Sequence, residues 1–438
     1  MLTFGTDGVR GVAFDELSEE YVFNLGRVAA QVLGISTVVV GRDTRESGQR
    51  LLTALSSGFV AGGASVQSLG VVPTPLVAFV AAQKQCAGAV VTASHNPYSD
   101  NGVKIFAVGG VKLSDEQQDN ISNSMALEPM GALLAEVPQL KQPTDSYLEH
   151  LASLFTPKAL SGVRVVLDCA NGAMSDVAPY AFARLGAEVI AIHCEPDGKN
   201  INAECGAAHT DALSEAVRLH QADMGLAFDG DGDRVIACDH AGNVVDGDHL
   251  LALAATDLRD RKKLRNNTVA VTVMTNAGFH RAMKEQKISV VTTAVGDRNI
   301  LVALDQHDLV LGGEQSGHII YRSHATTGDG ALAGLMLLDL VRRKGVPLQQ
   351  LAREAMTSLP QVLINVKVER MEKDLAKLFA KEIADAEKQL QGVGRVLLRA
   401  SGTEPLVRVM VEAQYEETAG KVAQALADSV ILRLGQHR

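Results

Sequence analysis

The sequence lacks several features that define common classes of protein. Its five cysteines are scattered, odd in number and never spaced as Cys-x-x-Cys, which disfavours a disulfide scaffold and a zinc site. No apolar run approaches the roughly 18 residues that span a bilayer, and the first ten residues carry charges where a signal peptide needs an apolar run. A net charge of -10 disfavours broad binding to nucleic acid or anionic membranes. We therefore expect a cytoplasmic protein that binds neither nucleic acid nor membranes.

What the sequence does contain is typical of globular domains. Its 438 residues are 46% hydrophobic and 21% charged, a length that predicts two to four domains. Three stretches alternate an apolar strand, a helix and a second strand, which predicts βαβ units with mixed, largely parallel sheets. They cover residues 36–69, 163–192 and 268–292. We predict three similar α/β domains and a smaller C-terminal α+β domain, with boundaries at 1–145, 146–248, 249–360 and 361–438.

The sharpest local motif is Asp229-Gly-Asp-Gly-Asp-Arg234, which follows the apolar run Met224–Phe228. Three carboxylates spaced two apart, with glycines between them, can converge on one hard cation such as Mg²⁺. An EF-hand would close with a glutamate at its twelfth position, where this chain has His240. The alternative interpretation is a polar turn in which the aspartates cap backbone groups.

The segment Thr92–Pro97 also follows an apolar run, and it contains Ser94 beside His95. The serine is a candidate nucleophile or phosphate carrier, although Ser-His-Asn also occurs in ordinary turns. The Gly-x-Ser-x-Gly elbow of serine hydrolases is absent here.

Two further loops carry groups suited to a phosphorylated ligand. Arg399–Pro405, followed by Arg408, could cradle an anion, or it could be a polar turn between two strands. Gly312–His318 offers a glutamate, a serine and a histidine for hydroxyl recognition and proton transfer. Arg10 and Lys104 each add a cation beside a glycine turn, where surface charge is the simpler explanation. Because open α/β sheets bind ligands at strand ends, these loops are expected to meet in one cleft.

Together these motifs resemble the α-D-phosphohexomutase superfamily, in the right order and along nearly the whole chain. The resemblance implies four domains around a central cleft and a phosphoryl group carried by Ser94. It also implies one Mg²⁺ per active site, bound by Ser94, Asp229, Asp231 and Asp233. The implied roles of the remaining residues are proton transfer or charge neutralisation for Arg10, Lys104 and His318, sugar binding for Glu314 and Ser316, and phosphate binding for Arg399, Ser401, Gly402, Thr403 and Arg408.

The opening Phe4–Gly11 and the loop Gly312–His318 look most like the branch that acts on glucosamine phosphates. That branch implies interconversion of glucosamine 6-phosphate and glucosamine 1-phosphate through a bisphosphate, in UDP-N-acetylglucosamine synthesis. Ala294 and Asn299 depart from the usual lysine and aromatic residue of relatives, which leaves mannose or glucose phosphates open as substrates. A non-catalytic sugar-phosphate sensor and a magnesium phosphatase also remain as alternatives, and a homodimer remains compatible with the sequence.

Overall fold

The computed structural model describes residues 2, 4–5, 8–369, 372, 374–400 and 406–435. The chain divides into two compact units, which we describe separately. Unit 1 comprises Met1–Met274 and Gln286–Ala355, and unit 2 comprises Thr275–Glu285 and Met356–Arg438. None of the described helices combines the length and the apolarity needed to cross a membrane.

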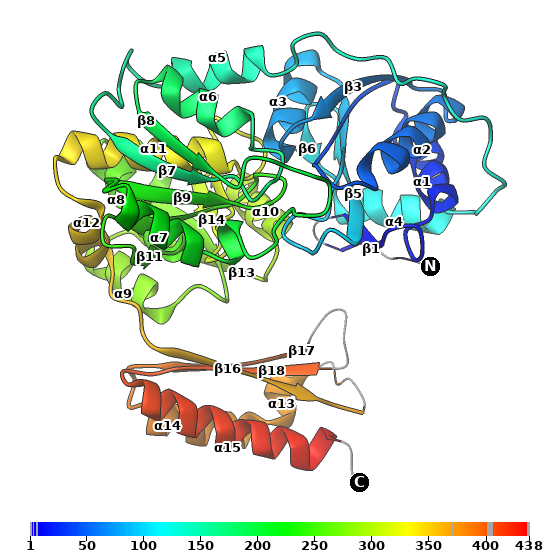
Figure 1. Ribbon diagram of the computed structural model, residues 1–438. Helices are drawn as coiled ribbons and strands as arrows, with labels where there is room; N and C mark the ends of the chain where they lie inside the picture. The colour runs from blue at the N-terminus through cyan, green and yellow to red at the C-terminus, as the bar shows by residue number, and fades with distance from the viewer. Residues whose placement is uncertain are drawn as a thin grey trace. The chain divides into compact units, whose positions relative to one another are not determined.

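The sheets described in unit 1 repeat one strand arrangement three times (Figure 1). A central strand pairs parallel with the next two strands in sequence, and the second of these pairs antiparallel with a fourth. The four strands are β2 (Thr37–Arg42), β3 (Ser65–Val71), β4 (Ala87–Val91) and β5 (Asp100–Ala107) in the first sheet; β7 (Arg164–Asp168), β8 (Glu188–Ile192), β9 (Met224–Phe228) and β10 (Val235–Asp239) in the second; and β12 (Thr268–Thr272), β13 (Ser289–Thr293), β14 (Leu311–Gly313) and β15 (Ile319–Tyr321) in the third.

Short antiparallel strands extend two of these sheets. They are β1 (Val9–Val12) and β6 (Val111–Lys112), which both pair with β5, and β11 (Val244–Val245), which pairs with β10. The prediction of similar α/β domains with mixed, largely parallel sheets is therefore confirmed.

Helices connect the strands and cover the sheets, so that α6 and α7 lie on opposite sides of the second sheet in Figure 1. The helices of unit 1 are α1 (Glu19–Leu33), α2 (Gly48–Ala61), α3 (Thr74–Lys84), α4 (Asp115–Ser124), α5 (Asp145–Ser153), α6 (Val177–Arg184), α7 (Asp211–Leu219), α8 (Gly247–Asp260), α10 (Asp297–Gln306), α11 (Gly330–Lys344) and α12 (Leu348–Ala355), with 3-10 turns η1 (Gly206–Ala208) and η2 (Arg265–Asn267).

Local sequence explains where these helices begin and end. In α1 the Ser18 side chain accepts a hydrogen bond from the Tyr21 N–H, two glutamates occupy the first turn, and Gly34 ends the helix with φ 63°. In α4 Ser114 and Gln117 form a reciprocal capping box.

Unit 2 is built on a three-stranded antiparallel sheet with β18 at its centre. Its elements are β16 (Gln361–Lys367), β17 (Arg395–Ala400), β18 (Leu406–Glu412), α9 (Ala277–Glu285), α13 (Leu375–Leu378), α14 (Ala380–Gln389) and α15 (Glu416–Leu434). The apolar faces of β18 and α15 share one buried core. A smaller C-terminal α+β domain is thus confirmed.

The contact between α1 and α2 depends on a missing side chain. A Cβ atom at Gly58 would overlap the carbonyl oxygen of Phe23, whereas a Cβ at Gly420, inside α15, would meet nothing within 4 Å. We expect Gly58→Ala to lower the free energy of unfolding of unit 1 by about 1–3 kcal/mol. Gly420→Ala should raise that of unit 2 by about 0.5–1 kcal/mol, because alanine loses less backbone entropy in a helix. Urea denaturation of both variants checks the opposite signs, and a Gly58→Ala protein as stable as wild type contradicts the packing argument.

Candidate functional site

The predicted loops of unit 1 leave the equivalent strand of each sheet. The Ser94 loop joins β4 to β5, the Asp229–Asp233 loop joins β9 to β10, and Glu314–His318 joins β14 to β15. Each loop therefore starts at the carboxyl end of a parallel strand, where open α/β sheets place their ligands.

Ser94 occupies a conformation that is uncommon for a residue with a side chain. Its φ is 53° and the residue is fully buried. Its N–H donates to Thr92 Oγ1 at 2.9 Å, and its carbonyl oxygen accepts hydrogen bonds from Arg45 at 3.1 Å and from Asn202 at 2.8 Å. The surrounding loops thus hold a strained backbone in place, as is common at functional sites.

The three aspartates of the β9–β10 loop converge. One carboxylate oxygen from each of Asp229, Asp231 and Asp233 lies within 4.8 Å of the others, and all three residues are buried. Gly232 between them has φ 71°, a conformation that glycine adopts without strain. The sequence spacing therefore produces the predicted cluster of carboxylates.

The serine and the aspartate cluster are in direct contact. Ser94 Oγ donates to Asp229 Oδ2 at 2.5 Å. A Cβ atom at Gly230 would come within 2.6 Å of the Ser94 carbonyl oxygen, so the absence of a side chain there permits the approach of the two loops. A hydroxyl and three carboxylates, far apart in sequence, thus meet at one point.

Two cationic side chains, buried Lys104 and partly buried Arg234, lie close to the three carboxylates. Lys104 Nζ contacts Asp231 Oδ2 and Asp233 Oδ2, each at 2.8 Å. Arg234 Nε lies 3.9 Å from Asp229 Oδ2 and from Asp233 Oδ1. These contacts matter because the carboxylates are buried, where unpaired charge is costly.

Orphaned oxygen atoms show that the cluster suits a metal ion. Asp231 Oδ1 and Asp233 Oδ1 are buried and have no hydrogen-bond partner among the described residues. Carboxylate oxygens are the ligands that Mg²⁺ and similar hard cations prefer, and these two are free of hydrogen bonds in the part of the chain that the structure describes. The acidic cluster could therefore bind a divalent metal.

Burial and neighbouring charges also shift the pKa values of Asp229 and Asp233. Burial, together with the negative charges of Asp233 and Asp231, raises the pKa of Asp229 to about 8. Burial alone would also raise the pKa of Asp233, but Lys104, His318 and Arg234 outweigh it and hold that pKa well below its usual range. Asp229 is thus the member of the cluster whose environment most favours a protonated carboxyl group near neutral pH.

His318 lies beside this cluster. Glu314 and Ser316 belong to the same loop as His318. Its Nδ1 is 3.5 Å from Asp233 Oδ1, and its Nε2 accepts the Gly328 N–H at 3.1 Å. Burial would lower the pKa of His318, but Asp233 and Asp297 outweigh it and raise that pKa. Glu314 accepts a hydrogen bond from the Gly296 N–H at 3.1 Å, and Ser316 is exposed to solvent.

The remaining predicted cations lie in different parts of the structure. In unit 1, Arg10 on β1 donates to Asn96 Oδ1, in the Ser94 loop, at 3.3 Å. In unit 2, Arg399 on β17 stands directly opposite Arg408 on β18. Arg408 Nε is buried and makes no hydrogen bond within the described ranges. Ser401, Gly402 and Thr403 lie outside the residues that the structure describes.

Sequence reasoning missed the residues that hold the serine loop. Arg45 is fully buried, pairs with Asp43 at 2.9 Å, and donates to the carbonyl oxygens of Ser94, Asn96, Pro97 and Asp100. Its place in a polar segment just after β2 is the same strand-end signal that identified the other loops. Asn202, which donates to the Ser94 and Asn96 carbonyl oxygens, lies in a loop with no such signal.

Comparison with known proteins gives four family matches in chain order. They are the alpha/beta/alpha domains I, II and III and the C-terminal domain of phosphoglucomutase/phosphomannomutase, which match residues 1–130, 145–242, 246–359 and 363–429.

Individual relatives match nearly the whole chain. A phosphoglucosamine mutase from Rhodococcus opacus is 48% identical over 440 residues, covering 98% of each chain. One from Frankia casuarinae is 49% identical over 442 residues, covering 97% of each. A crystal structure of a phosphoglucomutase/phosphomannomutase family protein from Burkholderia thailandensis superimposes with a TM-score of 0.80 at 23% identity, over 98% of this chain and 97% of that one. The last match shows that the fold is shared.

The role of Arg45 can be tested by removing its charge. Arg45→Met leaves Asp43 as an uncompensated buried charge and strips four carbonyl oxygens of a donor, so we expect a loss of about 3–5 kcal/mol in the free energy of unfolding. Arg50→Met is the matched control, because Arg50 also pairs with a carboxylate, Glu19, but is exposed, and it should cost much less. Denaturant unfolding of both variants measures the difference, and equal losses would show that burial of Arg45 is not what matters.

Proposed function

We propose that this chain, which belongs to the phosphoglucomutase/phosphomannomutase family, is a phosphoglucosamine mutase that interconverts glucosamine 6-phosphate and glucosamine 1-phosphate. The name of both full-length relatives supports the amino-sugar substrate. The observation that carries the proposed chemistry is the 2.5 Å contact between Ser94 Oγ and Asp229 Oδ2 inside the buried acidic cluster. It puts a potential phosphate carrier against a potential metal site.

In the proposed reaction the phosphoryl group starts on Ser94. A sugar hydroxyl attacks the phosphorus, the bond from phosphorus to Ser94 Oγ breaks, and the hydroxyl proton is passed on so that the serine is again a hydroxyl. The product is the 1,6-bisphosphate, which reorients and returns its other phosphoryl group to Ser94. Mg²⁺ bound by Asp229, Asp231, Asp233 and the phosphate on Ser94 would neutralise charge on the transferring group.

The other predicted residues complete the proposal. Arg10, Lys104 and His318 neutralise charge or transfer protons at the reacting oxygens. Their contacts with the Ser94 loop and with Asp231 and Asp233 support those roles. We further propose that Glu314 and Ser316 bind the sugar and that Arg399, Ser401, Gly402, Thr403 and Arg408 bind the distal phosphate.

The physiological setting is also part of the proposal. Glucosamine 1-phosphate is the product that UDP-N-acetylglucosamine synthesis requires, so we place the chain in that pathway, in the cytoplasm, and a homodimer is compatible with this role. The four matched segments support domains at 1–145, 146–248, 249–360 and 361–438.

Ser94→Ala tests the phosphate carrier. Purified wild-type protein should carry one phosphoryl group that maps to Ser94, visible by intact-mass analysis and peptide mapping. The variant should lack it and should lose more than about 10⁴-fold in isomerisation rate, the scale on which removal of a covalent nucleophile acts. Ser99→Ala is the control, because Ser99 is an exposed serine of the same loop. Undiminished isomerisation by Ser94→Ala contradicts the proposed mechanism.

The substrate is tested on the same wild-type preparation with glucosamine, glucose and mannose 6-phosphates. The highest kcat/KM should be on the amino sugar. A higher value on glucose or mannose phosphate would make the chain a phosphoglucomutase or phosphomannomutase, and release of free phosphate without isomer would indicate a phosphatase. Binding without turnover of any of the three would indicate a sensor.

Mg²⁺ affinity should depend on pH, because the ion must displace the proton that Asp229 holds. With the pKa of Asp229 raised to about 8, affinity should fall by up to about tenfold per unit as the pH drops below 8, and it should level off above it. Calorimetric titration of dephosphorylated protein on both sides of pH 8, in buffers of different ionisation enthalpy, measures the affinity and the released proton. In Asp229→Asn the residual affinity should lose this pH dependence, and a wild-type affinity that does not change with pH refutes the assignment.

A further inference from the structure

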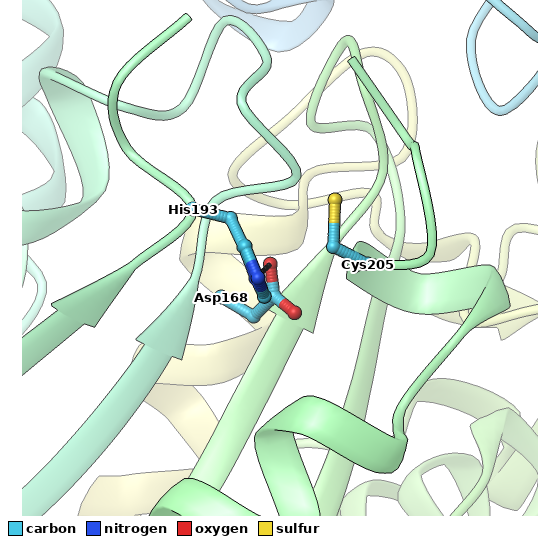
Figure 2. A group of neighbouring side chains, drawn as sticks. All are labelled: Asp168, His193 and Cys205. Carbon is cyan, nitrogen blue, oxygen red and sulfur yellow. Dashed lines mark ion pairs between the residues drawn. The ribbon is translucent and has the colours of Figure 1, made fainter. Parts of the chain in front are cut away.

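A second cluster of potential metal ligands lies at the second sheet of unit 1. It shares no residue with the acidic cluster. Asp168 ends β7, His193 follows β8, and Cys205 precedes η1. One oxygen, nitrogen or sulfur atom from each lies within 4.8 Å of the others. Figure 2 shows the Asp168 and His193 side chains lying against each other, with Cys205 beside them. Three segments, spread over 38 positions of the sequence, thus bring three different donor atoms together.

The contact between the imidazole and the carboxylate has a specific geometry. His193 Nδ1 lies 3.1 Å from Asp168 Oδ1, and this nitrogen is buried, yet the pair is not aligned as a hydrogen bond. A nitrogen and an oxygen that bind the same ion, at 2.0–2.2 Å each, stand about this far apart. The two atoms are therefore spaced as ligands of a common ion would be.

Two backbone N–H groups hold the Asp168 carboxylate in place. Asp168 Oδ1 accepts the Ala170 N–H and Oδ2 accepts the Gly206 N–H, each at 2.9 Å. A carbonyl-type oxygen has two acceptor positions, so each bond leaves one position on its oxygen for another partner. Hydrogen bonds of this kind orient a metal-binding carboxylate and are characteristic of metal sites.

We propose that Asp168, His193 and Cys205 form a binding site for a thiophilic divalent cation of the Zn²⁺ or Co²⁺ type. Sulfur and imidazole nitrogen are ligands that such ions prefer, whereas Mg²⁺ takes oxygen donors. Three protein ligands leave the fourth position of a tetrahedral ion for water. The site therefore differs in kind from Asp229, Asp231 and Asp233, which offer oxygen alone.

The alternative is a nucleophilic cysteine activated by the histidine and the aspartate. Cys205 has no exposed surface, so no substrate carbonyl or phosphoryl group reaches its sulfur. The His193 side chain is 32% exposed, which is enough for a small ion to enter from the imidazole side. Burial thus favours a bound ion over covalent catalysis.

An ion in this site would act on the loop that supports Ser94. Asn202 lies three residues before Cys205, and its N–H donates to the Ala170 carbonyl oxygen at 2.9 Å. Its side chain donates to the carbonyl oxygens of Ser94, at 2.8 Å, and Asn96, at 3.1 Å. Coordination of Cys205 and Asp168 would tie this loop to the end of β7 and would hold Asn202 against the serine loop.

Cobalt titration tests the site directly. Metal-free full-length protein is first saturated with Mg²⁺, which occupies the oxygen-only cluster, and Co²⁺ is then added. The expected result is a near-ultraviolet thiolate-to-cobalt charge-transfer band that saturates at one equivalent. Excess Zn²⁺ should abolish the band and should raise the melting temperature of the protein.

Two variants and a control test whether the charge-transfer band comes from Co²⁺ bound at Cys205 and His193. Cys205→Ser should abolish it, and His193→Gln should weaken Co²⁺ affinity by at least about tenfold, the lower end of what loss of even an outer ligand partner costs. Cys238→Ser, at another buried free cysteine of the same sheet, should leave the band unchanged.

The proposal is overturned if the wild-type protein gives no band, or if the band survives Cys205→Ser. Should Cys205→Ser fail to fold by circular dichroism, His193→Gln decides the matter. Unchanged Co²⁺ affinity in that variant rejects the site, and a tenfold or greater loss supports it.

Discussion

The placement of three buried carboxylates around one point is the constraint on which the active region of unit 1 depends. Asp229, Asp231 and Asp233 repel one another in a site that water barely reaches, and burial of unpaired charge is strongly unfavourable. Lys104 and Arg234 offset part of that cost, and a proton on Asp229 offsets more. A divalent cation could take the place of that proton, because it would bind the same carboxylate oxygens. The fold thus gathers the carboxylate oxygens that could bind such an ion before any substrate arrives.

The fold makes that placement possible by repeating one arrangement of strands. In each sheet of unit 1 the functional loop joins the third parallel strand to the antiparallel fourth, at β4–β5, β9–β10 and β14–β15. This connection reverses the direction of the chain, so that side chains such as Ser94 and Asp229 lie just beyond the strand ends, where hydrogen bonds hold their loops. Preorganisation of this kind is what phosphoryl transfer requires, because its catalysis depends mainly on positioning and on charge neutralisation.

Much of this arrangement was predictable from the sequence, because its signals are local. Short continuous apolar runs located the strands. The segment Asp229-Gly-Asp-Gly-Asp predicted its own convergence, since the spacing of the carboxylates and the glycines lies within one loop. The contacts made by Arg45, Asn202 and Lys104 were not predictable, because each depends on which loops of different sheets or strands come together. The Asp168–His193–Cys205 cluster was missed for the same reason, as its ligands share no local spacing.

Unit 2 contains two arginines that face each other on neighbouring strands. Arg399 and Arg408 are cross-strand neighbours, and like charges at directly opposite positions destabilise an antiparallel sheet. Arg408 adds a buried Nε without a hydrogen-bond partner in the described residues, a cost that a protein without a ligand would avoid by using a neutral side chain. A guanidinium can bind a phosphate with paired N–H donors, so the Nε of Arg408, unpaired within the described ranges, is a donor suited to an anion. The acidic cluster of unit 1 and the arginine pair of unit 2 thus each place charged groups where apolar packing alone would not call for them.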